Sequence, residues 1–171
     1  MVLSGCRDTP SHTGPATAPL QPATSAVAGL TATVTKVVDG DTIDVRLGTA
    51  RERVRLIGID TPESVKPDSP VECFGPEASS QLTSLIPVGT EVELVRDAEI
   101  RDPYDRLLAY VFRRSDGLFV NLSMAGDGFA GALSIAPNTT FADDFRAAVA
   151  QARSHRLGLW GACPNPDSLF G

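Results

Sequence analysis

Hydrophobic and polar residues alternate in two segments on either side of the dipeptide Asp39-Gly40. The first segment runs from Leu30 to Val38, and the second runs from Thr42 to Leu47. A period of two is typical of half-buried β-strands, and Asp-Gly between two such runs is a hairpin signal. The sequence therefore predicts an antiparallel pair of strands at the start of the folded region.

The remaining pattern predicts three more strands and about three helices. The strands are expected at 53–57, 91–94 and 107–112, and the helices at 75–86, 120–127 and 138–158. Residues 107–112 are apolar on both faces, which favours a central or curled strand. Five strands with a helix between the third and the fourth predict a β-rich α+β domain, an OB-type five-stranded Greek-key barrel with about three helices.

Three regions differ in composition. Ser, Thr, Pro and Ala dominate the first 29 residues, which predicts a disordered tail. Residues 30–163 are expected to form the single domain, and 164–171 a short C-terminal tail. No run of 18 apolar residues is present, so the sequence predicts no membrane span.

Cys6 follows a run of small residues that resembles the lipobox of bacterial lipoproteins. On this interpretation Cys6 is lipidated, the tail is a tether, and the protein is extracellular or attached to the bacterial cell envelope. The charged and apolar regions of a signal peptide do not precede Cys6, so an ordinary free cysteine remains the alternative. An even pair in an exported chain also predicts a disulfide between Cys73 and Cys163, with two buried thiols as the alternative.

The charge balance changes what can be expected of a ligand. Lys and Arg number 15 against 21 Asp and Glu, which gives a formal net charge of −6. Such a chain is poorly suited to hold a polyanion through phosphate contacts alone, so we expect weak binding with a shallow dependence on salt. A metal ion could offset the repulsion locally.

Two carboxylates are the candidate metal ligands. Asp41 begins one predicted strand, and Asp60 follows its antiparallel neighbour, so strand pairing would bring them together. Hard oxygen ligands without Cys or His favour Ca²⁺ or Mg²⁺ over zinc. Asp-Gly-Asp turns are also common on solvated surfaces, and the turn alone is weak evidence.

Three further side chains could perform chemistry beside such a cation. Glu63 lies just beyond Asp60 and could activate a water molecule. Arg55 and Arg106 could clamp phosphate oxygens as charge develops, although each arginine taken alone could equally form a surface ion pair.

From about Thr31 to Trp160, the sequence resembles the thermonuclease, or staphylococcal nuclease-like, family. Six ordered blocks carry the resemblance: Val38–Thr42, Arg55–Glu63, Phe74–Ser79, Asp102–Tyr110, Pro137–Asn138 and Leu159–Trp160. The resemblance implies a Ca²⁺-dependent phosphodiesterase that acts on DNA and RNA and leaves 3′-phosphates.

The resemblance also implies roles for individual residues. Asp41, Asp60 and the carbonyl of Thr61 would bind Ca²⁺, and Glu63 would be the base. Arg55 and Arg106 would clamp phosphate, while Tyr104 and Asp102 would contact the substrate. Single-stranded DNA or RNA is the expected substrate, and the protein is expected to be a monomer.

Two departures from the family pattern carry consequences. Leu133 and Ile135 stand where a well-known member has tyrosines that pack on the nucleotide, so stacking is expected to be lost. Asp105 replaces a glycine before Arg106, at a turn that aspartate can still form.

The alternative function comes from another class of protein. Barrels of this family also serve as non-catalytic modules that bind nucleic acid or protein through degraded sites. Because both aspartates, the glutamate and both arginines are all present here, the enzyme is favoured.

Overall fold

The computed structural model describes residues 29–64 and 71–170. Cys6, and all of the predicted N-terminal tail except Gly29, lie outside the described residues. The strands and helices follow one another in this order: β1 (Leu30–Val37), β2 (Thr42–Leu47), β3 (Ala50–Leu56), β4 (Gly58–Asp60), α1 (Gly75–Leu85), β5 (Glu91–Val95), β6 (Leu107–Arg113), β7 (Leu118–Phe119), α2 (Val120–Gly126), β8 (Gly131–Leu133), α3 (Ala142–Ser154), α4 (Leu159–Ala162) and a 3₁₀ helix (Pro166–Phe170).

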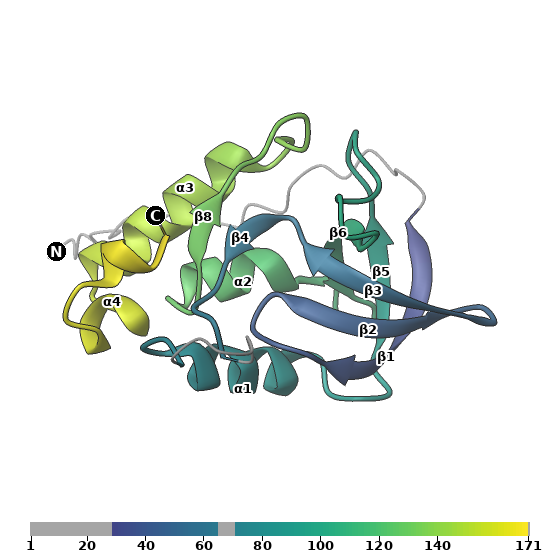
Figure 1. Cartoon of the computed structure of the whole chain (residues 1–171), viewed down its shortest axis with the longest axis horizontal. Coiled ribbons are helices and arrows are strands. Elements are labelled where there is room, and N and C mark those ends of the chain that lie inside the picture. The colour runs from purple at the N-terminus through teal and green to yellow at the C-terminus, as the bar shows by residue number, and fades with distance from the viewer. Residues whose placement is uncertain (1–28, 65–70, 171) are drawn as a thin grey trace, which may run out of the picture.

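Five of these strands close into a barrel (Figure 1). β1 pairs antiparallel with β2 and β5, β2 with β3, and β5 with β6. A parallel pairing between β3 and β6 completes the circle. The predicted OB-type five-stranded barrel is therefore confirmed.

The alternating residues of the strands explain the core. Ile43, Val45 and Val54 are fully buried inside the barrel, whereas their neighbours along β2 and β3 face outward. β6 is apolar on both faces because one face belongs to the barrel core and α2 packs against the strand. Phe145 of α3 is also fully buried, so the helices and the barrel share one core.

The third strand differs from its prediction because the chain bends at Ile57. β3 starts earlier than expected and ends at Leu56, and the chain then continues as β4, which pairs with β8 outside the barrel. Gly58 makes this bend possible, since its φ is +87° and a Cβ there would overlap the ring of Phe145. Leaving the barrel at this point directs Asp60 away from the core.

The C-terminal region is less regular than the single predicted helix. α3 ends at Ser154, and α4 begins after Gly158 as a separate turn. Figure 1 shows α3 and α4 on the side of the molecule opposite the β2–β3 hairpin. The predicted C-terminal tail forms a 3₁₀ helix, and Phe170 packs on Trp160 with ring centroids 5.7 Å apart.

A disulfide joins Cys73, just before α1, to Cys163 at the end of α4, with Cα atoms 6.0 Å apart. It fastens the C-terminal helices to the segment that precedes α1. Among the helices in the described part of the chain, none is long and apolar enough to cross a membrane.

Candidate active site

Asp41 lies at the turn that leads into β2, and its side chain is almost completely buried. One carboxylate oxygen accepts hydrogen bonds of 3.1 Å from both the backbone N–H and the hydroxyl of Thr61. The other accepts a 3.0 Å bond from the hydroxyl of Thr42. The turn before β2 and the end of β4 are thereby held together, which brings Asp41 beside Asp60.

Arg55 connects the two aspartates. One terminal nitrogen of its guanidinium, Nη2, lies 3.1 Å from Asp41 Oδ2 and 2.9 Å from Asp60 Oδ1. The other terminal nitrogen donates to the carbonyl oxygens of Leu56 and Ile59, at 2.8 and 2.9 Å. The guanidinium is therefore fixed by four oxygens at the point where β3 bends into β4.

Several carboxylates lie close together here, and the pKa values of two of them, Asp60 and Asp39, are raised. Burial raises the pKa of Asp60 above its ordinary value, the Arg55 guanidinium opposes this, and the charges of Asp41, Glu72 and Glu63 reinforce it. Burial and the charge of Asp41 raise the pKa of Asp39 to about 6. A cluster of this kind is stabilised by a cation or by partial protonation.

Glu63 is held by a reciprocal pair of contacts with Glu72. The backbone N–H of Glu63 donates to the Glu72 carboxylate at 2.8 Å, and the backbone N–H of Glu72 donates to the Glu63 carbonyl at 2.9 Å. The next residue, Cys73, is the one bound to Cys163. The disulfide thus anchors the segment that positions Glu63.

The second arginine is positioned by Asp102. Nε of Arg106 donates to Asp102 Oδ2 at 2.6 Å, and Asp102 Oδ1 accepts the backbone N–H groups of Arg106 and Tyr104. Burial alone would raise the pKa of Asp102, but these hydrogen bonds outweigh it and lower the pKa. Tyr104 is largely exposed, and its ring lies 5.5 Å from the Arg106 guanidinium.

The turn at Asp105 has the backbone that a glycine would supply. Its φ is +64°, in the left-handed region that aspartate tolerates better than most residues. The Asp105 carboxylate faces Arg101 at 3.6 Å, and Arg101 also donates to the Asp105 carbonyl at 2.7 Å. Because Asp105 is paired with Arg101, Arg106 stays available toward the cavity.

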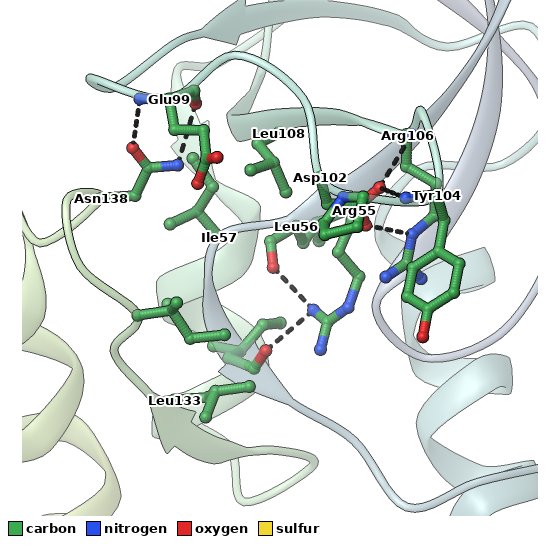
Figure 2. A pocket seen from close by; sticks show the side chains of 14 residues that line it. Arg55, Leu56, Ile57, Glu99, Asp102, Tyr104, Arg106, Leu108, Leu133 and Asn138 are labelled. Carbon is green, nitrogen blue, oxygen red and sulfur yellow. Dashed lines mark hydrogen bonds and ion pairs between the residues drawn. The ribbon is translucent and has the colours of Figure 1, made fainter.

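Both arginines line one cavity of about 270 Å³ (Figure 2). Its walls are mainly apolar, and Leu133 and Ile135 are among them. Asn138 closes the far side by exchanging two hydrogen bonds with the backbone of Glu99, at 2.7 and 2.9 Å. The cavity thus combines apolar walls with two guanidinium groups.

The oxygen donors suit a hard cation. One nitrogen of Arg55 touches both Asp41 and Asp60, so these carboxylates already converge on a single positive group. No set of three His, Cys, Asp or Glu side chains converges in this way among residues 29–64 and 71–170. Two carboxylates and a carbonyl would leave a Ca²⁺ or Mg²⁺ site open to water and phosphate.

The sequence predicted no role at the site for three residues of this region, although Asn138 belongs to one of the blocks that carry the resemblance. Glu72 and Asn138 support the site through backbone hydrogen bonds that no local pattern announces. Asp39 was noted only as part of a turn, yet its carboxylate accepts the backbone N–H of Asp41 at 3.1 Å. Its place two residues before Asp41 was the one available signal.

Comparison with known proteins gives a consistent picture. The sequence model described as "Staphylococcal nuclease homologue" matches residues 53–162. The chain is 38% identical over 142 residues to "Thermonuclease" of Staphylococcus intermedius, which covers 83% of each chain. It is 37% identical over 130 residues to "Endonuclease YncB" of Bacillus subtilis, covering 75% of this chain and 60% of that one. The chain belongs to the staphylococcal nuclease family.

Proposed function

We propose that this protein is a nuclease that hydrolyses phosphodiester bonds in nucleic acid. One observation carries the proposal. Arg55 contacts the paired carboxylates of Asp41 and Asp60, and it also lines the cavity that Arg106 lines from the turn before β6. Two guanidinium groups beside a candidate cation site are suited to stabilise a phosphate as it gains negative charge.

The relatives support this proposal. Two of them are named thermonuclease, and two from Bacillus subtilis are named endonuclease. The chain covers 83% and 73% of the length of the two thermonucleases, so the similarity extends over most of both proteins.

Asp41, Asp60 and the carbonyl of Thr61 would hold Ca²⁺. The ion would act as a Lewis acid that polarises a phosphate oxygen. Ca²⁺ accepts irregular, partly hydrated shells of oxygen ligands, which fits a site with only two protein carboxylates.

Glu63 would act as the base. It would take a proton from water as the water oxygen attacks phosphorus and the bond from phosphorus to the 5′ oxygen breaks. The 5′ oxygen would take up a proton from solvent water, so that a 3′-phosphate and a 5′-hydroxyl result, and Glu63 would release its proton to solvent. Arg55 and Arg106 neutralise the phosphate oxygens during this step. Tyr104 and Asp102 would complete the substrate contact.

The substrate we propose is single-stranded DNA or RNA, and the active form a monomer. The open cavity accepts a base that has been separated from its neighbour, whereas a stacked duplex base is not accessible to it. We further propose an extracellular or cell-envelope location, with residues 1–29 as a tether lipidated at Cys6 and residues 30–163 as the nuclease domain.

The test is cleavage of a labelled single-stranded oligonucleotide with Ca²⁺ or with a chelator. We expect cleavage only with Ca²⁺ at about millimolar concentration, as for weak extracellular sites. Asp41→Ala should abolish it, because the variant loses a cation ligand, whereas Asp143→Ala on the exposed surface of α3 should not. Equal cleavage by Asp41→Ala in chelator would refute the calcium assignment.

A further inference from the structure

The outer face of the β2–β3 hairpin concentrates positive charge in a protein that is acidic overall. Arg51, Arg53 and Arg55 occupy alternate positions of β3 and therefore point to the same side. Arg46 of β2 lies directly opposite Arg51, and Asp44 lies opposite Arg53. Asp44 is the acidic residue on this face of β2, and on its other side it lies opposite Lys36 of β1.

The pair formed by Arg46 and Arg51 has no compensating partner. Both residues are exposed, and neither side chain makes a hydrogen bond or an ion pair within residues 29–64 and 71–170. Residues directly opposite in an antiparallel pair have Cβ atoms about 5 Å apart, where like charges repel and destabilise the sheet. A bound anion would remove this repulsion.

The middle of the face is differently organised. Arg53 makes two hydrogen bonds to Asp44, at 2.7 and 3.2 Å, and half of its side chain remains exposed. This ion pair directs the guanidinium across the hairpin toward β2. With Lys36 on the other side of Asp44, the three side chains still carry a net positive charge.

The spacing of these arginines matches an extended polyanion. Side chains two residues apart on a strand are about 6.6 Å apart, close to the separation of successive phosphates in an extended single strand. The row ends at Arg55, which contacts both candidate cation ligands. It is therefore continuous with the site at which the chain would be cut.

Acidic residues limit the surface on its other side. Glu91 and Glu93 of β5 lie opposite Thr33 and Thr31 of β1, two strands and about 10 Å from β2. A polyanion on this side of the barrel is thus restricted to β2 and β3. Figure 1 shows these two strands running side by side from the central bend to the free hairpin tip.

We propose that Arg46, Arg51 and Arg53 form a track that binds the sugar–phosphate backbone of a single-stranded nucleic acid leading away from the active site. The proposal rests on the nuclease function proposed above. It commits to a polynucleotide rather than an anionic membrane because the row ends at Arg55. It predicts a steeper salt dependence than the shallow one expected from the net charge of −6.

The experiment compares two double variants in a Glu63→Ala background, in which loss of the base prevents cleavage. Arg46→Gln/Arg51→Gln removes the unpaired arginines of the track. Arg114→Gln/Arg146→Gln makes the same charge change at two exposed arginines away from it. Binding of a labelled oligothymidylate of about 20 nucleotides, longer than one barrel can cover, is measured against a thymidine dinucleotide, and circular dichroism verifies the fold.

In Arg46→Gln/Arg51→Gln, we expect the affinity for the oligothymidylate relative to that for the dinucleotide to fall about tenfold. The slope of log binding constant against log salt concentration for the oligothymidylate should become smaller in magnitude by about 1.4, which corresponds to two single-strand phosphate contacts. The control variant should leave both quantities unchanged. Equal effects of the two variants would overturn the track. Binding of the same variants to phosphatidylglycerol vesicles is measured in parallel. If Arg46→Gln/Arg51→Gln loses vesicle binding but keeps oligonucleotide binding, the face binds a membrane and the proposal of a track is overturned.

Failure of the track can be distinguished from failure of the proposed function. With Glu63 intact, cleavage of the dinucleotide in Ca²⁺ tests the nuclease without involving the hairpin. A protein that cuts the dinucleotide but shows no change in affinity ratio retains its function and lacks the track. A protein that cuts neither substrate refutes the function itself.

Discussion

Single side chains at this site are held by more than one partner before any substrate arrives. Asp41 accepts bonds from Thr42 and Thr61, and Asp102 accepts bonds from Arg106 and Tyr104. Preorganised groups do not have to reorient as charge develops during a reaction, and this is the main source of electrostatic catalysis. Arginines that only formed surface ion pairs would not need such a network, so it supports the proposed contact of both arginines with phosphate.

The geometry of Arg106 predicts the effect of a conservative change. Arg106→Lys keeps the charge but loses the planar fork, which binds Asp102 through Nε and, in the proposed mechanism, would offer its terminal nitrogens to phosphate. We expect kcat/KM to fall by about 10²-fold or more, with a native circular dichroism spectrum. Arg113→Lys, at an arginine that also binds an aspartate, Asp116, through Nε but does not line the cavity, is the matched control and should remain close to wild type. Near-normal turnover of Arg106→Lys would remove the bidentate clamp from the mechanism.

Between elements, polar contacts align the helices with the barrel. Asp97 follows β5, and its carboxylate accepts a 2.8 Å hydrogen bond from the hydroxyl of Tyr110 in β6, whose side chain is buried. The backbone N–H and the hydroxyl of Thr140 donate to the same carboxylate just before α3. One residue thus connects β5, β6 and the segment that leads from the cavity wall into α3.

Asp97→Ala should reduce the free energy of unfolding by about 1–3 kcal/mol at about pH 7, because the Tyr110 hydroxyl loses its acceptor. Burial alone would raise the pKa of Asp97, but the bonds from Tyr110 and Thr140 outweigh it and lower the pKa below its ordinary value. A lowered pKa in the folded state contributes stability that is present above about pH 4 and disappears as the pH falls through the folded-state value.

Urea titrations of both proteins at about pH 7 and about pH 2 measure this dependence. The difference in unfolding free energy should shrink at the lower pH, where the wild-type carboxylate is protonated as well. Asp143→Ala removes an exposed ion pair with Arg146 and should change stability by no more than about 0.5 kcal/mol. A difference that stays constant with pH would contradict the assigned hydrogen bonds.

At the scale of the molecule, the disulfide closes a loop that contains most of the domain. Cys73 and Cys163 are separated by 90 residues in the sequence. In the chain-entropy model, a bridge across a loop of this size stabilises the folded state by about 4–5 kcal/mol. It also connects α4 with the segment that holds Glu63.

Cys73→Ala/Cys163→Ala should therefore lower the free energy of unfolding by about 2–5 kcal/mol. Thermal and urea unfolding would measure the loss, and dithiothreitol should destabilise the wild type but not the double variant. Because Glu63 is anchored through Glu72 next to Cys73, turnover should decline before the fold is lost on heating. A variant as stable as the wild type under oxidising conditions would show that the bridge makes no net contribution.

The sequence by itself determined the barrel, because strand periodicity and turn signals are local properties of the chain. Ile43, Val45 and Val54 alternate with polar neighbours, and this alternation specifies which face is buried before any partner strand is known. The resemblance carried by the blocks around Asp41, Asp60 and Arg106 also identified the family, since those blocks combine residue type with spacing.

Only the tertiary structure decided how distant residues cooperate. The bend at Gly58, the anchoring of Glu63 by Glu72 and the closure of the cavity by Asn138 all join segments far apart in the sequence, through hydrogen bonds or steric fit that no local pattern encodes. The same reason applies to charge. The composition gives a net charge of −6, but the register of β2 and β3 places Arg46 opposite Arg51. The pairing of these strands therefore concentrates positive charge beside the candidate active site, which composition alone could not indicate.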